Sequence, residues 1–320
     1  MLKYILKRLL HLIPVVIIIS ICIFCIVKMA PGDPVGANVD PRATAEQKAA
    51  ERERLGLTKP LHIQYLKWME RSIRGDFGES YLYKQPVSEV IPQFIWNSFL
   101  LNVVVYIIAF LIAIPVGIMT AVKQYSKTDN FWAIFSIIGI SMPSFFFGLL
   151  LIYAFSVKLN WFPMNGMITP GKNAMGFAKF VDVIKHMVLP AIVLTVGSLA
   201  GLVRYTRTSM LEVINEDYIR TARSKGLSEK VVIYKHAFRN ALIPIITLLG
   251  FSIPGLFSGA VILEKVFVWP GIGNVLMDAI NARDYNMVMA LNIFFALLTL
   301  LGNLLADIGY ALVDPRVKVE

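Results

Sequence analysis

The chain has 320 residues, of which 57% are hydrophobic and 16% charged, and its mean hydropathy is +0.65. Such an apolar composition excludes an ordinary soluble domain and is typical of a multi-spanning membrane protein. The net charge of +10 does not indicate nucleic-acid binding, because no basic run outside the apolar segments is interleaved with aromatic residues. Loop charge in a membrane protein accounts for it.

The first apolar segment covers residues 9–27 and follows Lys3, Lys7 and Arg8. A secretory signal is the alternative, but the run is longer than a signal core and no small-residue cleavage site follows it. We therefore expect a transmembrane helix whose basic end lies in the cytoplasm. Cys22 and Cys25 form a C-x-x-C inside this segment, and we interpret them as packing residues rather than a redox pair.

Residues 31–97 are the only long hydrophilic segment and carry nine basic and nine acidic side chains. We expect a helix over 43–55 that Gly56 ends, and a second one that Pro60 opens. A third is expected over 87–97. The second has an apolar face of residues four apart: Leu61, Tyr65, Met69 and Ile73. These patterns predict a small helical extracytoplasmic region, so residues 1–97 and 98–320 are expected to be separate domains.

Five further apolar segments cover residues 98–122, 131–157, 186–208, 242–264 and 288–312. Each is long enough to cross the hydrocarbon core of a bilayer. Four contain an internal proline, and we interpret these prolines as packing kinks rather than gates: Pro115, Pro143, Pro190 and Pro254. The predicted fold class is an all-α membrane protein with six transmembrane helices.

Loop charges predict the orientation. With both termini in the cytoplasm, the cytoplasmic pieces (1–8, 123–130, 204–240 and 314–320) carry 15 Lys or Arg, and the two short outer loops carry six. Positive charge concentrates on the cytoplasmic side of membrane proteins, and long loops count little in this rule.

A charged stretch, residues 215–244, separates two of the apolar segments and predicts a helical hairpin. Asn215 is the expected N-cap and Gly226 the expected C′ residue, with acidic residues in the first turn and basic residues in the last. Ser228 and Glu229 are expected to open a second helix. Because a polar hairpin has little of its own to pack against, we expect it to dock on another protein, with Ala222 allowing a close backbone approach.

The order of residues in this stretch resembles the cytoplasmic "EAA" loop of ABC importer permeases. Thr221-Ala222-Arg223 stands where that motif has E-A-A, Gly226 fits its glycine, and Leu242-Ile243-Pro244 stands near its closing I-x-L-P. The run from Tyr218 to Leu227 is similar to the dipeptide and oligopeptide branch. The resemblance implies a cytoplasmic coupling loop over 209–241 and a coupling helix over 215–226 that docks on an ATPase. It implies this role for Glu216, Asp217, Tyr218, Arg220, Thr221, Ala222, Arg223, Lys225 and Gly226.

Further blocks resemble the B-type subunit of the same branch. They are Pro31-Gly32-Asp33-Pro34, Leu55-Gly56-Leu57-x-Lys59-Pro60, Gly75-Asp76-Phe77-Gly78-x-Ser80, the block Glu264–Gly273 with Trp269-Pro270-Gly271 at its centre, and Asp314-Pro315-Arg316. The resemblance implies a type I ABC importer permease (MetI-like) core, preceded by an N-terminal helix and a helical extracytoplasmic insertion. It also implies a bacterial inner-membrane location and import of dipeptides or oligopeptides by alternating access.

The implied partners are a second homologous permease chain, two ATPase subunits, an extracytoplasmic substrate-binding protein and the lipid bilayer, with no nucleic acid. No cofactor is expected in this chain, because ATP and magnesium would bind the partner ATPases. The sequence contains no phosphate-binding G-x4-G-K-[ST], no H-E-x-x-H and no G-x-S-x-G, and its four histidines lack metal-ligand spacing. We therefore expect that the chain is not an enzyme by itself.

Polar residues inside the spans are candidates for a gate or pathway: Arg204, Asp307, Asn303, Ser141, Ser198 and Trp269. For the neutral ones, a hydrogen bond to a neighbouring helix is the simpler interpretation. Arg204 and Asp307 lie at similar depths in spans four and six and are candidates for an ion pair. In the alternative, Arg204 reaches lipid phosphates and Asp307 bonds Asn303, Tyr310 or the partner permease.

Three other functions stay open at this point. The same architecture imports nickel chelates or oligosaccharides in other members of the branch. A proton-coupled secondary transporter needs a membrane-embedded relay, for which only Asp307 is available. A membrane scaffold without transport leaves the coupling-like hairpin unexplained.

Overall fold

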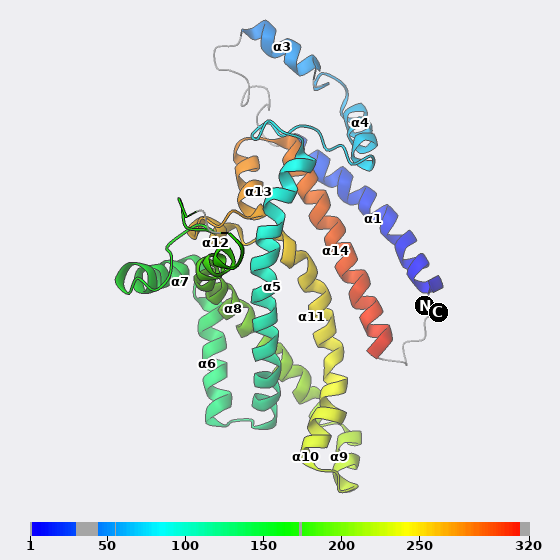
Figure 1. Ribbon diagram of the computed structural model, residues 1–320. Helices are drawn as coiled ribbons and strands as arrows, with labels where there is room; N and C mark the ends of the chain where they lie inside the picture. Colours follow the sequence, from blue (N-terminus) through cyan, green and yellow to red (C-terminus); the bar gives the residue numbers. More distant parts are fainter. Residues whose placement is uncertain (1, 30–43, 55, 173–174, 314–320) are drawn as a thin grey trace. The chain divides into compact units, whose positions relative to one another are not determined.

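The computed structural model describes residues 2–29, 44–54, 56–172 and 175–313 (Figure 1). Its helices are α1 (Leu2–Met29), α3 (Ala45–Arg54), α4 (Leu61–Ile73), α5 (Val87–Val122), α6 (Lys127–Ser141), α7 (Ser144–Leu151), the π-helix η1 (Ile152–Lys158), α8 (Gly176–Ile214), α9 (Asp217–Ser224), α10 (Glu229–Val231), the π-helix η2 (Val232–Ala237), α11 (Phe238–Ser258), α12 (Val261–Val266), α13 (Ile272–Asn281) and α14 (Tyr285–Val313). In the described ranges the only β feature is one bridge between Glu79 and Pro86. The predicted all-α class is confirmed.

Five continuous stretches of the described chain are long and apolar enough to span a membrane: Leu10–Met29, Val87–Val122, Gly176–Ile214, Pro244–Val266 and Tyr285–Gly309. The expected span over 131–157 is not one straight helix. It is divided into α6 and the stretch Ser144–Lys158, which meet at an angle of 100°. The chain therefore has six spans only if this bent pair counts as one.

Pro143 explains the division. Its ring forces the preceding residue out of the helical region, and Met142 is extended, with φ −80° and ψ 122°. Pro143 then occupies the N-cap position of α7. The expectation of a mere kink at this proline was wrong, whereas Pro190 and Pro254 lie inside continuous helices as expected.

The chain divides into two compact units. Unit 1 comprises Met1–Ser98, Phe257–Val261 and Gly271–Leu301, and unit 2 comprises Phe99–Leu256, Ile262–Pro270 and Gly302–Glu320. The domain division between residues 97 and 98 stays a prediction. The expected helices of the hydrophilic segment are present as α3 and α4, and the third, over 87–97, is the first part of α5. The block Pro31-Gly32-Asp33-Pro34 and the C-terminal Asp314-Pro315-Arg316 lie outside the described residues.

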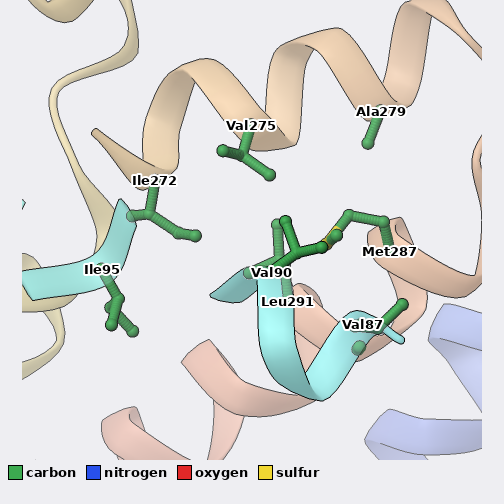
Figure 2. Packing of buried hydrophobic residues seen from close by; sticks show 9 residues of the cluster. Val87, Val90, Ile95, Ile272, Val275, Ala279, Met287 and Leu291 are labelled. Atoms are coloured by element: carbon green, nitrogen blue, oxygen red, sulfur yellow. The ribbon is translucent and has the colours of Figure 1, made fainter. Parts of the chain in front are cut away.

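The core of unit 1 joins α5, α13 and α14. Figure 2 shows α13 side chains above those of the first turns of α5, with residues of α14 beside them. The fully enclosed members are Val87, Val90, Ile272, Val275, Ala279, Met287, Ala290 and Leu291. Phe77 and Tyr83 of the loop before α5 pack against this cluster, which joins the loop to the start of α14.

The face of α4 differs from the sequence prediction. Leu61 and Ile73 are 59% and 78% exposed, whereas Tyr65 and Trp68 pack against Phe24 of α1. The Tyr65 hydroxyl lies 2.8 Å from the hydroxyl of Ser20. The face of α4 that packs against α1 is thus aromatic and only partly buried.

A buried carboxylate organises the loop that carries Gly75–Ser80. Asp284 accepts hydrogen bonds from the Ser80 hydroxyl (2.5 Å) and from the backbone N–H groups of Leu82 (3.1 Å) and Met287 (3.2 Å). Gly78 has φ +84°, and a Cβ there would lie 2.9 Å from Nδ2 of Asn286. The glycine-containing block Gly75–Ser80 is therefore held against the start of α14, and we call this set of contacts around Asp284 the clasp.

Unit 2 has close helix contacts at small residues. A Cβ on Gly117 of α5 would lie 2.5 Å from Cβ of Thr206 in α8. Asn102 of α5 donates to the carbonyl of Leu256 in α11 (3.3 Å), as expected for a polar residue within a span. Trp269 is fully buried against Leu101 and Met187.

We expect Asp284→Ala to lower the free energy of unfolding of unit 1 by about 1–3 kcal/mol, because three donors, two of them buried, lose their acceptor. Thermal unfolding and hydrogen exchange of residues 80–90 in the purified, detergent-solubilised chain measure the effect. Glu89→Ala is the control, since Glu89 is exposed. Equal melting temperatures and equal exchange rates for the two variants would contradict the role of the clasp.

Candidate functional site

The candidate site is the helical hairpin of residues 216–237, formed by α9, a glycine turn, α10 and η2 (Figure 1). It begins where α8 ends. Asn215 is the C-cap of α8, and its side-chain amide donates to the carbonyl of Leu211 (3.1 Å). Glu216 is the extended N-cap residue of α9, so the prediction of Asn215 as N-cap was wrong. The reason is that α8 continues past the apolar segment that the sequence delimits.

The C-terminal end of α9 follows the prediction. The N–H of Gly226 donates to the carbonyl of Arg223 (2.9 Å), and the N–H of Leu227 donates to that of Ala222 (3.4 Å). These two bonds form a Schellman motif, which requires a left-handed residue at C′. Gly226 has φ +75°, and a Cβ there would meet no atom within 4 Å. The glycine is therefore needed for its backbone conformation and not for space.

One face of α9 is buried within the chain itself. Ile219 is 0% and Ala222 7% exposed. They pack in a cluster, here called the hairpin floor, with residues of α5, α8, η2 and α11: Ile118, Ala121, Met210, Val232, Ile233, Ala237 and Ala241. The expectations that the hairpin lacks packing of its own, and that Ala222 admits a partner backbone, were wrong. The sequence did contain a signal for this buried face, because Ile219 and Ala222 are apolar residues three apart in an otherwise polar helix.

The opposite face of α9 is exposed and charged. Asp217 and Arg220 form an ion pair of 3.4 Å, and Tyr218 is 43% exposed. Across the turn, Arg223 donates from Nη2 and Nε to the two carboxylate oxygens of Glu229 (2.7 and 3.3 Å). These hydrogen bonds lower the pKa of Glu229. Of the predicted coupling residues, all except Ala222 lie on the exposed surface: Glu216, Asp217, Tyr218, Arg220, Thr221, Arg223, Lys225 and Gly226.

A partly buried ion pair joins α8 to α6. Nε and Nη2 of Arg207 in α8 donate to the two carboxylate oxygens of Asp129 in α6 (2.8 and 2.9 Å). Asp129 also accepts from the N–H of Tyr125, and its own N–H donates to the N-cap Ser126. Sequence reasoning missed this pair. The signal was a single carboxylate in the short segment 123–130 and a second arginine three residues after Arg204.

The candidate gate residues do not form the predicted ion pair. Across the described ranges Arg204 is in ion-pair contact with no carboxylate, so it is not paired with Asp307. Arg204 instead lines two cavities of about 550 and 260 Å³, the first shared with Ser141. The other candidates are partly or fully buried: Ser198, Asn303 and Asp307 partly, and Trp269 fully.

No three His, Cys, Asp or Glu side chains in the described part of the chain lie close enough to hold a metal ion. The hairpin combines a rigid apolar attachment with an exposed polar face. Such an arrangement can bind another protein and transmit its movement to α5, α8 and α11.

These features define a multi-pass α-helical membrane protein with an exposed helical hairpin. Residues 113–319 match the family described as "Binding-protein-dependent transport system inner membrane component", and residues 1–93 match its N-terminal companion family. The chain belongs to this family of inner-membrane permeases.

Curated relatives match over the full length. The chain is 45% identical over 319 residues to the oligopeptide transport system permease protein AppB of Bacillus subtilis, covering 99% of this chain and 100% of the relative. It is 38% identical over 320 residues to the glutathione transport system permease protein GsiC of Salmonella paratyphi A, with both chains covered completely. The expected resemblance to the dipeptide and oligopeptide branch of ABC importer permeases is confirmed.

A solved structure shares the fold. A chain from inward-facing conformations of the MetNI methionine ABC transporter aligns with a TM-score of 0.52 at 16% identity, covering 70% of this chain and 96% of that chain. The type I permease fold is thereby confirmed. As a permease the chain is not an enzyme, and ATP hydrolysis occurs in separate ATPase subunits.

We expect Gly226→Val to destabilise the C-terminal end of α9 by about 1–2 kcal/mol, because a side chain is disfavoured in the left-handed region. Faster hydrogen exchange over residues 219–227 of the purified chain would report this change. Gly226→Asn is the matched variant, since asparagine adopts this conformation more readily, and its exchange should stay near that of the native chain. Equal protection in both variants would show that the turn does not depend on glycine.

Proposed function

We propose that this chain is one of two permease subunits in an importer of dipeptides or oligopeptides, and that the hairpin docks on an ATPase. One observation carries the proposal. The buried side of α9 attaches it to the rest of the chain through Ile219 and Ala222, and its other side exposes Asp217, Tyr218 and Arg220. An exposed aromatic residue next to charges is a composition typical of protein–protein contacts. The peptide substrate is supported by the names of full-length relatives.

In the proposed mechanism two ATPase subunits bind ATP and magnesium, and this chain holds neither. Closure of the ATPases moves α9. Because α9 packs on the hairpin floor, α5, α8 and α11 move with it, and the spans alternate between inward and outward openings. A second homologous permease completes the pathway, and an extracytoplasmic binding protein delivers the substrate.

The proposed orientation places the hairpin and both termini in the cytoplasm and α3 and α4 outside. The excess of Lys and Arg in the short segments on the hairpin side supports it. Import of nickel chelates or oligosaccharides by the same architecture is the alternative substrate class. Family membership excludes the secondary transporter and the scaffold.

We expect Tyr218→Ala to weaken retention of the ATPase by roughly 30-fold, the scale of a 2 kcal/mol interface residue. Co-purification of the complex at a series of protein concentrations measures it, together with peptide-stimulated ATP hydrolysis in lipid nanodiscs. Tyr125→Ala is the matched control, because Tyr125 is 85% exposed and lies outside the hairpin. Equal retention by both variants would remove the docking role from α9.

Orientation is tested by cysteine labelling of intact cells, after replacement of the exposed Cys22 and Cys25 by alanine. We expect Arg52→Cys in α3 to react with a membrane-impermeant maleimide, and Arg220→Cys in α9 to react only after permeabilisation. The physical reason for this expectation is that Lys and Arg in short loops are retained on the cytoplasmic side of the membrane. The opposite labelling pattern would invert the proposed topology.

A further inference from the structure

Unit 1 contains a basic cavity that the transport mechanism does not use. Its volume is about 360 Å³, and its walls come from the end of α1, from α4, from the start of α14 and from Glu53, Arg54, Gly56, Leu57 and Lys59. The lining includes five Lys or Arg against two acidic residues. One of those two, Asp76, is already bonded to Arg71 (2.8 Å). Cations therefore outnumber carboxylates in the cavity lining.

Lys28 is the most enclosed of these cations. It lies in the last turn of α1, is half-buried, and has no carboxylate within ion-pair distance among the described residues. Its Nζ lies 5.7 Å from the ring centre of Phe24 and 5.6 Å from that of Tyr285. The two aromatic faces stabilise the ammonium through cation–π attraction without neutralising its charge. An anion in the cavity would complete the site.

Two further donors face the same space. The indole Nε1–H of Trp68, which lines the cavity, is buried and has no hydrogen-bond acceptor. Buried donors almost always find an acceptor, so this one indicates a ligand or ordered water. Contact with the Lys59 side chain, together with its positive charge, lowers the pKa of Lys67. Two adjacent ammonium groups are stabilised by an anion that bridges them.

We propose that this cavity binds the phosphate of an anionic phospholipid. Lys28 ends the apolar span Leu10–Met29, so the cavity lies at the level where a bilayer has its phosphates. Beside it, α1 exposes apolar side chains that acyl chains can cover: Ile18, Ile21 and Ile26 are 61%, 42% and 69% exposed. A soluble phosphate shares the headgroup chemistry but gains nothing from this apolar surface.

The headgroup charge sets the specificity. A phosphate with an uncharged glycerol headgroup leaves its full negative charge for Lys28, Lys59 and Lys67. The choline of a zwitterionic lipid would place a second cation among these lysines. The site therefore selects phosphatidylglycerol over phosphatidylcholine.

Native mass spectrometry of the full chain in mild detergent tests the site. The probes are phosphatidylglycerol, phosphatidylcholine with the same acyl chains, and glycerol 3-phosphate. We expect one tightly retained phosphatidylglycerol, and roughly 30-fold weaker retention in the double variant Lys28→Gln/Lys67→Gln, because two basic contacts are lost. Trp68→Phe keeps the ring but removes the N–H donor, and it should weaken retention several-fold while α4 stays in place.

Lys48→Gln is the control, because Lys48 lies on α3 outside the cavity lining. Equal retention of the two lipids, or equal retention of phosphatidylglycerol by the double variant and Lys48→Gln, would overturn the proposal. Displacement of the lipid by glycerol 3-phosphate at similar concentration would assign the cavity to a free phosphate anion instead and would also overturn it. Circular dichroism of each variant distinguishes loss of the site from loss of the fold.

Discussion

The burial of Ile219 and Ala222 is the contact on which the hairpin depends. A helix of eight residues is not stable alone in water, because nucleation costs more than its few hydrogen bonds return. Burying one isoleucine side chain contributes about 1.5–3 kcal/mol. The two Schellman hydrogen bonds at Gly226 satisfy carbonyls at the end of α9 that would otherwise lack a partner within the helix. The hairpin is therefore an integral part of the folded chain, and its exposed face is held in position without a partner.

The π-helix η2 makes the hairpin floor possible. Val232 and Ala237, both buried in the floor, are five residues apart. In an α-helix of 3.6 residues per turn they would point in directions about 140° apart. The wider i→i+5 turn of η2 brings them closer to one face, and the following α-helix places Ala241 in line with them. Short π-helical segments within α-helices are frequent at functional sites. In this chain η2 joins α10 directly to α11.

Local sequence rules predicted the elements well and their contacts poorly. Length, apolarity and capping residues located the spans, α3, α4 and the Gly226 turn, because those features depend on residues near in sequence. The break at Pro143 was misjudged because a membrane proline either kinks or divides a helix, and packing decides which. The burial of Ala222, the burial of Trp269 and the Asp129–Arg207 pair depend on residues far away in the sequence, 78 positions for Asp129 and Arg207 and 168 for Leu101 and Trp269. In the sequence, each residue of such a long-range contact is visible only as an isolated charged or apolar residue, and its partner cannot be identified.

The position of the Asp129–Arg207 pair follows from the length of α8. Its 39 residues make a rod of about 58 Å, whereas the hydrocarbon core is about 30 Å thick. The end that carries Met210 therefore projects beyond the apolar layer and supports α9. Just before Met210, two contacts hold α8 to its neighbours. There, Arg207 is tied to α6 by two charge-assisted hydrogen bonds, and Thr206 packs directly on Gly117 of α5. In the proposed mechanism these contacts make α5, α6 and α8 respond as one body to a force on α9, so the movement reaches the spans instead of being absorbed at their ends.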